Sequence, residues 1–168
     1  SPSRFGAAVT FTAILGNARN PSGEVSFVEG STTLCTVPLS RGAAQCSPPH
    51  LAVGNHSITA VYAGDVKNAG ASGGLNQTVN AVAASAPAIT SVVAGDAQVA
   101  VAWTEPTNNG GAAITGYTVT AYADANRTQA AGTCATPAVS PPAQVATGCM
   151  VSGLTNRTAY VFTVMAHN

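Results

Sequence analysis

The stretch "LAVGNHSITAVYAGD", residues 51–65, alternates between two kinds of side chain. Every second residue from His56 to Tyr62 falls on one face of an extended chain, while two hydroxyls and a valine fall on the other. A period of two residues is typical of a β-strand that buries one face against a core. The stretch therefore predicts such a strand, with His56 and Tyr62 as structural core residues.

The same alternation recurs along the rest of the chain. Further strands are expected within residues 9–15, 23–27, 31–39, 42–46, 74–80, 89–106 (two strands), 114–124, 149–154 and 159–166. Their inward positions hold four more aromatic core candidates, Phe11, Trp103, Tyr117 and Tyr160. No apolar pattern keeps the spacing of an amphipathic helix over three turns. Short strands separated by turn residues predict an all-β fold made of β-sandwiches.

Composition agrees with this prediction. Hydrophobic residues make up 46% of the 168 residues but aromatic residues only 5%, and the chain has 17 Gly and 10 Pro. The hydrophobic share is mostly Ala and Val, with Thr and Ser between them, which favours sheets built from small residues over helices.

One segment separates two series of predicted strands. The piece "AVAASAPA", residues 81–88, has no turn residues that tie it to either side and carries a proline near its end. Such composition is typical of a linker. We therefore expect two tandem domains, 1–82 and 88–168, joined by a linker at 83–87.

The four cysteines form two pairs that are local in sequence. Cys35 lies near Cys46 and Cys134 near Cys149, and neither pair has the C-x-x-C spacing of a zinc or redox motif. We expect both pairs to be disulfides, which places the protein in an oxidising compartment. The Pro-rich segment 135–147 between the second pair is expected to be a surface loop.

A hairpin is the predicted geometry of the first pair. Ser40 and Arg41 separate two predicted strands, so a turn there would place Cys35 opposite Cys46. Opposed residues of antiparallel strands have Cα atoms about 4.5 to 5.5 Å apart, a separation that a disulfide accepts.

Low charge excludes several classes of partner. Only 7% of the residues are charged, six basic and six acidic, against roughly 25% in a typical soluble domain. Without a basic stripe we expect no nucleic-acid partner. No apolar run approaches the roughly 18 residues of a membrane-spanning helix, so we expect no membrane insertion. We also expect that any export signal has been removed.

No residue is assigned to catalysis, a cofactor or a metal. The segment "GASGG", residues 70–74, matches G-x-S-x-G around Ser72, but no helical pattern follows, so we expect a flexible loop instead of a nucleophile elbow. Asp65 and Asp96 each follow a glycine, a pattern that indicates turn residues in preference to calcium ligands. His50 and His167 are expected to be surface residues, and Glu24, Glu29 and Glu105 are not arranged as an obvious acid/base pair. The protein is therefore predicted not to be an enzyme.

Two resemblances follow from these motifs. The second half, through "QVAVAWTEP" and "GLTNRTAYVFTVMAHN", resembles a bacterial fibronectin type III domain, with Trp103 on its second strand and Tyr160 at its tyrosine corner. The first half, through "LAVGNHSITAVYAGD", resembles the immunoglobulin-like repeats of bacterial surface proteins. This resemblance implies stalk, spacer or adhesion modules and names no ligand.

Both outer strands are expected to be missing. Relative to these families, a strand before Ser1 and a strand after Asn168 are absent from the sequence. Either the ends are boundaries cut from a longer protein, or a neighbouring subunit or segment supplies the strands. In the second case, the edge of the final strand is a template for strand addition.

We therefore expect a non-catalytic, extracellular structural or adhesive pair of modules in a stalk or fibre of a bacterial surface. Its partners are expected to be protein, from itself or neighbouring modules, or a surface glycan. Two alternatives remain open: a spacer region of a secreted polysaccharide-acting hydrolase, and a filament or virion subunit that assembles by strand exchange. Glycosylation also stays open at four sequons, Asn55, Asn76, Asn126 and Asn156.

Overall fold

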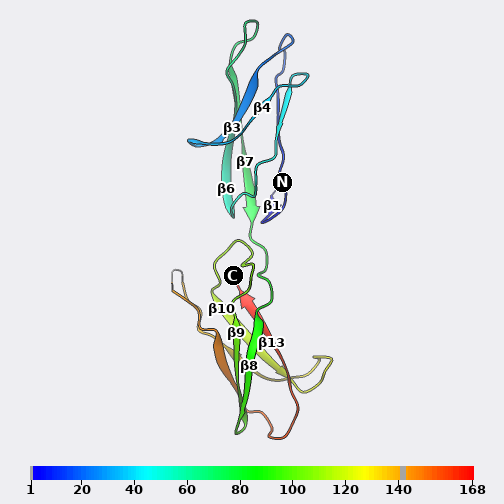
Figure 1. Cartoon of the computed structure of the whole chain (residues 1–168), viewed down its shortest axis with the longest axis vertical. Coiled ribbons are helices and arrows are strands. Elements are labelled where there is room, and N and C mark those ends of the chain that lie inside the picture. The colour runs from blue at the N-terminus through cyan, green and yellow to red at the C-terminus, as the bar shows by residue number, and fades with distance from the viewer. Residues whose placement is uncertain (1, 141–142) are drawn as a thin grey trace. The chain divides into compact units, whose positions relative to one another are not determined.

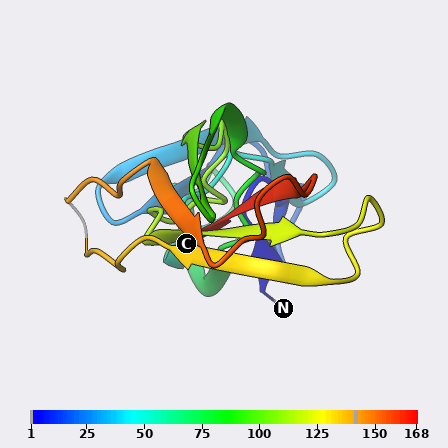
Figure 2. The same cartoon turned by 90° about the horizontal axis from the view of Figure 1, so that it is seen from below.

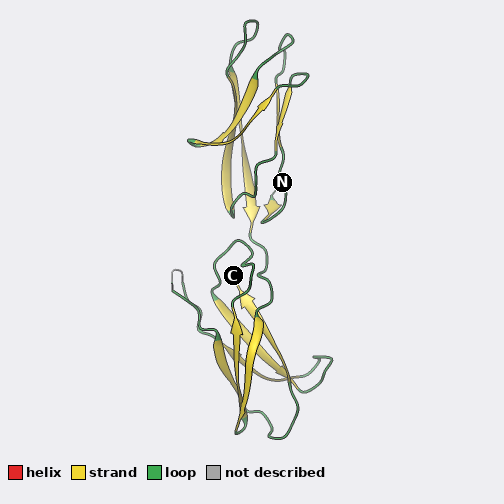
Figure 3. Ribbon diagram, in the orientation of Figure 1, coloured by secondary structure: helices red, strands yellow, loops and turns green. Residues whose placement is uncertain are grey.

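The computed structural model describes residues 2–140 and 143–168. Within this part of the chain every regular element is a β-strand and none is a helix (Figure 3). The chain divides into unit 1, Ser1–Ala81, and unit 2, Val82–Asn168. Each unit has its own hydrophobic core, and Figure 1 shows the strands of the whole chain coloured from the N-terminus to the C-terminus. The all-β prediction with two tandem sandwiches is confirmed.

Unit 1 contains two sheets of unequal width. Its strands are β1 (Ser3–Arg4), β2 (Phe11–Ile14), β3 (Glu24–Glu29), β4 (Thr32–Pro38), β5 (Ala43–Cys46), β6 (Gly54–Tyr62) and β7 (Ala71–Asn80). One sheet has the order β1-β7-β6-β3-β4, and the other consists of β2 and β5. A two-stranded layer therefore faces a five-stranded one.

The core of unit 1 lies between these sheets, on the faces that alternation predicted. His56, Ile58 and Tyr62 of β6 are buried. Phe11 of β2 and Phe27 of β3 approach from opposite sheets, with ring centroids 6.5 Å apart. This aromatic pair joins the two layers of the core.

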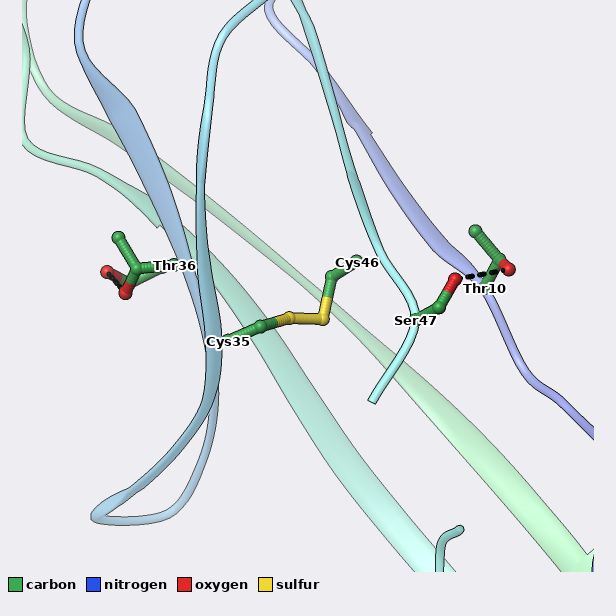
Figure 4. Close-up of a disulfide and its surroundings, with 6 residues drawn as sticks. Thr10, Cys35, Thr36, Cys46 and Ser47 are labelled. Carbon is green, nitrogen blue, oxygen red and sulfur yellow. Dashed lines mark hydrogen bonds between the residues drawn. A yellow bond between two sulfur atoms is a disulfide. The ribbon is translucent and has the colours of Figure 1, made fainter. Parts of the chain in front are cut away.

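The predicted hairpin between Cys35 and Cys46 is wrong, although the structure does join the two cysteines. Cys35 lies on β4 in the wide sheet and Cys46 on β5 in the narrow one, with Cα atoms 6.3 Å apart. Figure 4 shows the bridge running from one ribbon to the other. A tight turn does follow β4, closed by Ser40 and Ala43, but it carries the chain into the other sheet. The disulfide therefore joins layers, not neighbouring strands.

Unit 2 is also a two-layered sandwich, but its six described strands are divided equally between the two sheets. They are β8 (Ala88–Gly95), β9 (Gln98–Thr104), β10 (Gly116–Tyr122), β11 (Ala130–Ala135), β12 (Gly148–Ser152) and β13 (Val161–His167). The sheets have the orders β12-β9-β8 and β11-β10-β13. Figure 2 shows β11, β10 and β13 side by side, coloured from yellow to red.

Alternation places the core of unit 2 correctly as well. Val99, Val101 and Trp103 of β9 are buried, and they face Tyr117 and other inward residues of β10. The Trp103 and Tyr117 rings meet edge to face, with centroids 5.2 Å apart. Edge-to-face packing is a preferred arrangement of aromatic rings.

Strand β11 was not expected from the sequence. Its residues, "AAGTCA", are small and have low β propensity. One of these residues, Gly132, has to be small, because an added Cβ would lie 2.9 Å from Val151 Cγ1 on the opposite sheet. The sheets approach closely here, next to the disulfide between Cys134 of β11 and Cys149 of β12. This second bridge also crosses between sheets, with Cα atoms 6.2 Å apart.

Two expectations about connecting segments need correction. Residues 83–87, expected as a linker, belong to unit 2, because the Ser85 N–H donates to the Asn108 carbonyl at 2.8 Å. Residues 71–74, expected as a flexible loop, form the first part of β7, where Ser72 pairs with Val61 of β6. Alternating hydrophobicity cannot detect such a strand, because its residues are Ala, Ser and Gly. The loop expected at 135–147 includes residues outside the described part, and its buried Val145 packs into the core.

Several strands at the edges of the sheets have a single neighbour among the described strands. Unit 1 has a short first strand, because Ser3 and Arg4 form β1 and pair in parallel with Val79 and Asn80 of β7. Strand β2, however, pairs only with β5 among the described strands. In unit 2, β13 likewise pairs only with β10.

Removing each disulfide is expected to destabilise its own unit. Replacing both Cys35 and Cys46 by Ala, or both Cys134 and Cys149, should lower the free energy of unfolding by about 3 kcal/mol, because a bridged loop of this length restricts the unfolded chain. The bridged residues are 11 and 15 positions apart. Urea denaturation followed by amide exchange in each unit would measure both effects. A double variant that leaves its own unit's stability unchanged would contradict this account.

Candidate functional site

A search for metal-binding groups among the described residues found none. Over residues 2–140 and 143–168, no three His, Cys, Asp or Glu side chains come together in a way that could hold a metal ion. A search for helices that could cross a membrane found none in this part. Two kinds of feature therefore remain as candidate sites. One is the polar contacts that hold the loops, and the other is the strand edges that have no neighbour among the described strands.

The aromatic core candidates occupy the positions expected of them. Phe11, Tyr62, Trp103 and Tyr117 are all at most 3% exposed. Tyr160 is half-buried and packs against the core of unit 2.

Tyr62 and Asp65 join two loops of unit 1. The Tyr62 hydroxyl donates to the Ser22 carbonyl at 2.9 Å. The Asp65 carboxylate accepts the backbone N–H groups of Ser22, Lys67 and Asn68, each at 2.8 Å. These N–H groups, first that of Ser22 and then that of Lys67, hold the pKa of Asp65 well below its usual range. The "Y-x-G-D" segment at the end of residues 51–65 thus holds two loops together through the side chains of Tyr62 and Asp65.

Tyr160 holds the corresponding corner of unit 2. Its hydroxyl oxygen accepts the Thr155 N–H at 2.9 Å, the geometry that the tyrosine-corner resemblance implied. This hydrogen bond lowers the pKa of Tyr160. Nearby, the Asn156 amide donates to Asp96 at 2.7 Å and its carbonyl oxygen accepts the Ala97 N–H. Asp96 therefore takes part in a turn, as Asp65 does.

His56 is buried with two acceptors that sequence reasoning did not find. Its Nδ1 lies 2.9 Å from a Glu29 carboxylate oxygen, and its Nε2 lies 2.9 Å from the Ala52 carbonyl. Both partners are acceptors, so only the protonated ring donates to both. The Ala52 carbonyl chiefly, then Glu29, raises the pKa of His56 against the opposing effect of burial. Glu29 lies on β3, beside β6, and only the strand pairing brings it to His56.

The other single candidates are dispersed. His50 is exposed, while His167 Nε2 lies 2.8 Å from the Thr118 hydroxyl on the outer face of unit 2. Ser72 lies inside β7, where it pairs with Val61 of β6. Glu24 lies on β3 in unit 1, and Glu105 lies in unit 2 just after β9.

Two buried polar atoms of unit 2 lack partners among the described residues. They are Trp103 Nε1 and the Tyr117 hydroxyl oxygen. Burial raises the pKa of Tyr117, and the negative charge of Glu105 adds to this effect. A buried polar group without a partner costs stability.

Removing one hydroxyl from each unit should give opposite results. Tyr117→Phe deletes a buried hydroxyl without a partner, so the free energy of unfolding is expected to stay the same or to rise by up to about 1 kcal/mol. Tyr62→Phe leaves the Ser22 carbonyl without its donor and should cost about 1 kcal/mol. Urea denaturation of both variants would test the contrast, which a larger loss in Tyr117→Phe would refute.

Unit 1 should lose stability as the pH rises above neutral. Because the pKa of His56 is raised above its ordinary value of 6.5, its contribution is complete below pH 6.5 and disappears as the pH passes through the higher pKa of the folded protein. Glu29→Gln keeps an acceptor but removes the charge, and should flatten this dependence. Urea titrations between pH 5 and 9, with NMR titration of His56, would measure it. The expectation fails if stability rises over that range.

Comparison with known proteins matches the two halves of the chain to two families. Residues 1–80 match the family described as "Bacterial Ig-like domain (group 3)", and residues 85–168 match the family described as "Fibronectin type III domain". A search of curated proteins gave no match.

Similar solved structures include domains A168-A170 of titin, with 19% identity and a TM-score of 0.44, and the chicken CNTN1 FN1-FN3 domains, with 16% identity and a TM-score of 0.41. Each alignment covers 99% of this chain but only 55% and 57% of the solved chains, so the chain spans little more than half their length. Tyr160 at its corner, Trp103 in its core and the two family matches agree: the chain belongs to the fibronectin type III family through its second half and carries a bacterial Ig-like domain of group 3 as its first.

Proposed function

We propose that the chain is a non-catalytic structural or adhesive module pair in a stalk or fibre on the outside of a bacterial cell. The observation that carries the proposal is the position of the two disulfides, each of which ties one sheet to the other at the same place in its sandwich. Such a bridge resists separation of the layers, which is what a load-bearing or protease-exposed module needs.

The bridges also support an extracellular location. Disulfides persist in oxidising compartments and are rare in the cytosol. Cys35, Cys46, Cys134 and Cys149 are all paired, and no free cysteine occurs in the structure. The bacterial Ig-like family of unit 1 is consistent with this location.

The remaining surface supports binding to proteins or glycans in preference to charged ligands. Six acidic and six basic residues are spread over the whole chain. Strand β13 offers seven residues, Val161–His167, whose outer edge no described strand covers. Unpaired edges of this kind accept strands from neighbouring molecules, so we include neighbouring modules, or further copies of the chain, among the proposed partners.

The location can be tested on cells that produce the native protein. An antibody against unit 2 should label intact cells, and thiol-reactive maleimide should label the protein only after reduction. Labelling restricted to lysed cells, or maleimide uptake without a reductant, would contradict the proposal. Cells that export a protein with an established disulfide provide the matched control.

A further inference from the structure

The turn "NNGG", residues 108–111, holds the first residues of unit 2 in place. The Gly110 carbonyl accepts the Val82 N–H at 3.0 Å, and the Asn108 carbonyl accepts the Ser85 N–H at 2.8 Å. Both acceptors belong to this one turn, and both donors lie among the first four residues of unit 2. The backbone of the NNGG turn therefore attaches the start of unit 2 to the rest of that unit.

The two glycines of the turn are required by its backbone. Gly110 has a φ of 73° and Gly111 a φ of 85°, left-handed values that favour glycine. A Cβ at Gly110 would also overlap the Val82 carbonyl oxygen, so no side chain fits between these two backbones. The fold therefore requires a glycine after Asn109, and no other asparagine of the sequence precedes a glycine.

An asparagine followed by glycine can be modified without an enzyme. The deprotonated backbone nitrogen of the glycine attacks the side-chain carbon Cγ of the asparagine, which closes a five-membered succinimide. The side-chain nitrogen leaves as ammonia and takes back the proton that the backbone nitrogen lost. Water then opens the ring: opening at Cγ gives aspartate, and opening at the backbone carbonyl gives isoaspartate, in which the main chain runs through Cβ and Cγ. Glycine favours ring closure because it has no Cβ to obstruct its nitrogen.

The Asn109 side chain is folded in the direction of this attack. Its Oδ1 accepts the Gly111 N–H at 3.0 Å, which is the hydrogen bond of an Asx turn. The ring closed by such a bond includes the Gly110 nitrogen and the Cα, Cβ, Cγ and backbone carbonyl carbon of Asn109, which are the five atoms of the succinimide. The attack places negative charge on Oδ1, and a donor at 3.0 Å lies within the range that stabilises an oxyanion.

The attacking nitrogen is held only by an exposed side chain. The Gly110 N–H donates to Asn108 Oδ1 at 2.8 Å, and Asn108 is exposed. Hydrogen bonds to exposed groups open more readily than those inside a sheet, so water can remove this proton. Asn109 is exposed as well, which gives water access to the ring. Asn108 makes the same Asx turn one residue earlier, but a residue with a side chain follows it, so it provides an internal comparison.

We propose that Asn109 is a site of spontaneous succinimide formation, and that its isoaspartate product releases residues 82–85 from the NNGG turn. Isoaspartate adds one carbon to the main chain just before Gly110, whose backbone already lies too close to Val82 to admit a methyl group. The Val82 and Ser85 N–H groups then lose their acceptors. This inference goes beyond the proposed function and does not rest on it, because the reaction needs only water and the folded chain.

The test follows the purified, intact chain during incubation at neutral and mildly alkaline pH. Chymotryptic peptide 104–117 contains both asparagines of the turn. Mass spectrometry with electron-transfer fragmentation locates the gain of about 1 Da and separates aspartate from isoaspartate. A synthetic peptide of residues 104–117 gives the rate without the fold. Asn109→Gln removes the site, because ring closure would then need a six-membered ring, and Asn108→Gln is the matched control that keeps the Asn-Gly pair.

In the folded chain, Asn109 should react about tenfold faster than Asn108, because the two share the Asx turn and differ in the residue that follows. It should react no more slowly than Asn109 of the synthetic peptide, and faster as the pH rises. Asn109→Gln should abolish the mass change, and Asn108→Gln should retain it. Amide exchange at Val82 and Ser85 should lose protection as isoaspartate accumulates, but not in Asn109→Gln.

Three results would overturn the proposal. The first is a slower reaction of Asn109 in the folded chain than in the synthetic peptide. The second is a mass change that Asn108→Gln prevents and Asn109→Gln does not. The third is unchanged exchange protection of Val82 and Ser85 after isoaspartate has formed. None of these results bears on the cell-labelling experiment.

Discussion

The covalent link between sheets is the constraint on which both units depend. In unit 1 the bridge joins the edge strands β4 and β5, and in unit 2 it joins β11 and β12, again the edge strands of opposite sheets. Each bridge lies beside buried residues that pair with its cysteines, Phe27 and Phe11 in unit 1 and Val119 and Val101 in unit 2. Sulfur atoms thus fix the distance between the layers where the core is formed.

This constraint compensates for cores that are poor in large side chains. Only 5% of the chain is aromatic, and burial of Ala and Val removes less apolar surface from water than burial of Leu or Phe. A sandwich of this kind gains much of its stability from restriction of its unfolded state and from polar clamps at its loops. Tyr62 with Asp65 holds one such loop, and Tyr160 holds another.

A sandwich that is bridged at one side has unequal sides. At the bridged side the disulfide holds the edge strands of the two sheets at a fixed separation, whereas no disulfide joins the edges of β2 in unit 1 or β13 in unit 2 to the opposite sheet. The disulfide therefore holds the two layers together at one side of each module, and the proposed structural role rests on this link.

The sequence by itself determined the fold class, the two families, the inward faces of most strands and the cysteine pairs, because each depends on local alternation or on short motifs. Tertiary structure alone decided that Cys35 and Cys46 lie on different sheets. A tight turn can connect two paired strands of a hairpin, or it can lead the chain into the other layer. It also decided that Glu29 meets His56 and that residues 71–74 form a strand. Those features arise from contacts between segments distant in sequence, and Ala, Gly and Ser give no hydrophobic period by which to predict them.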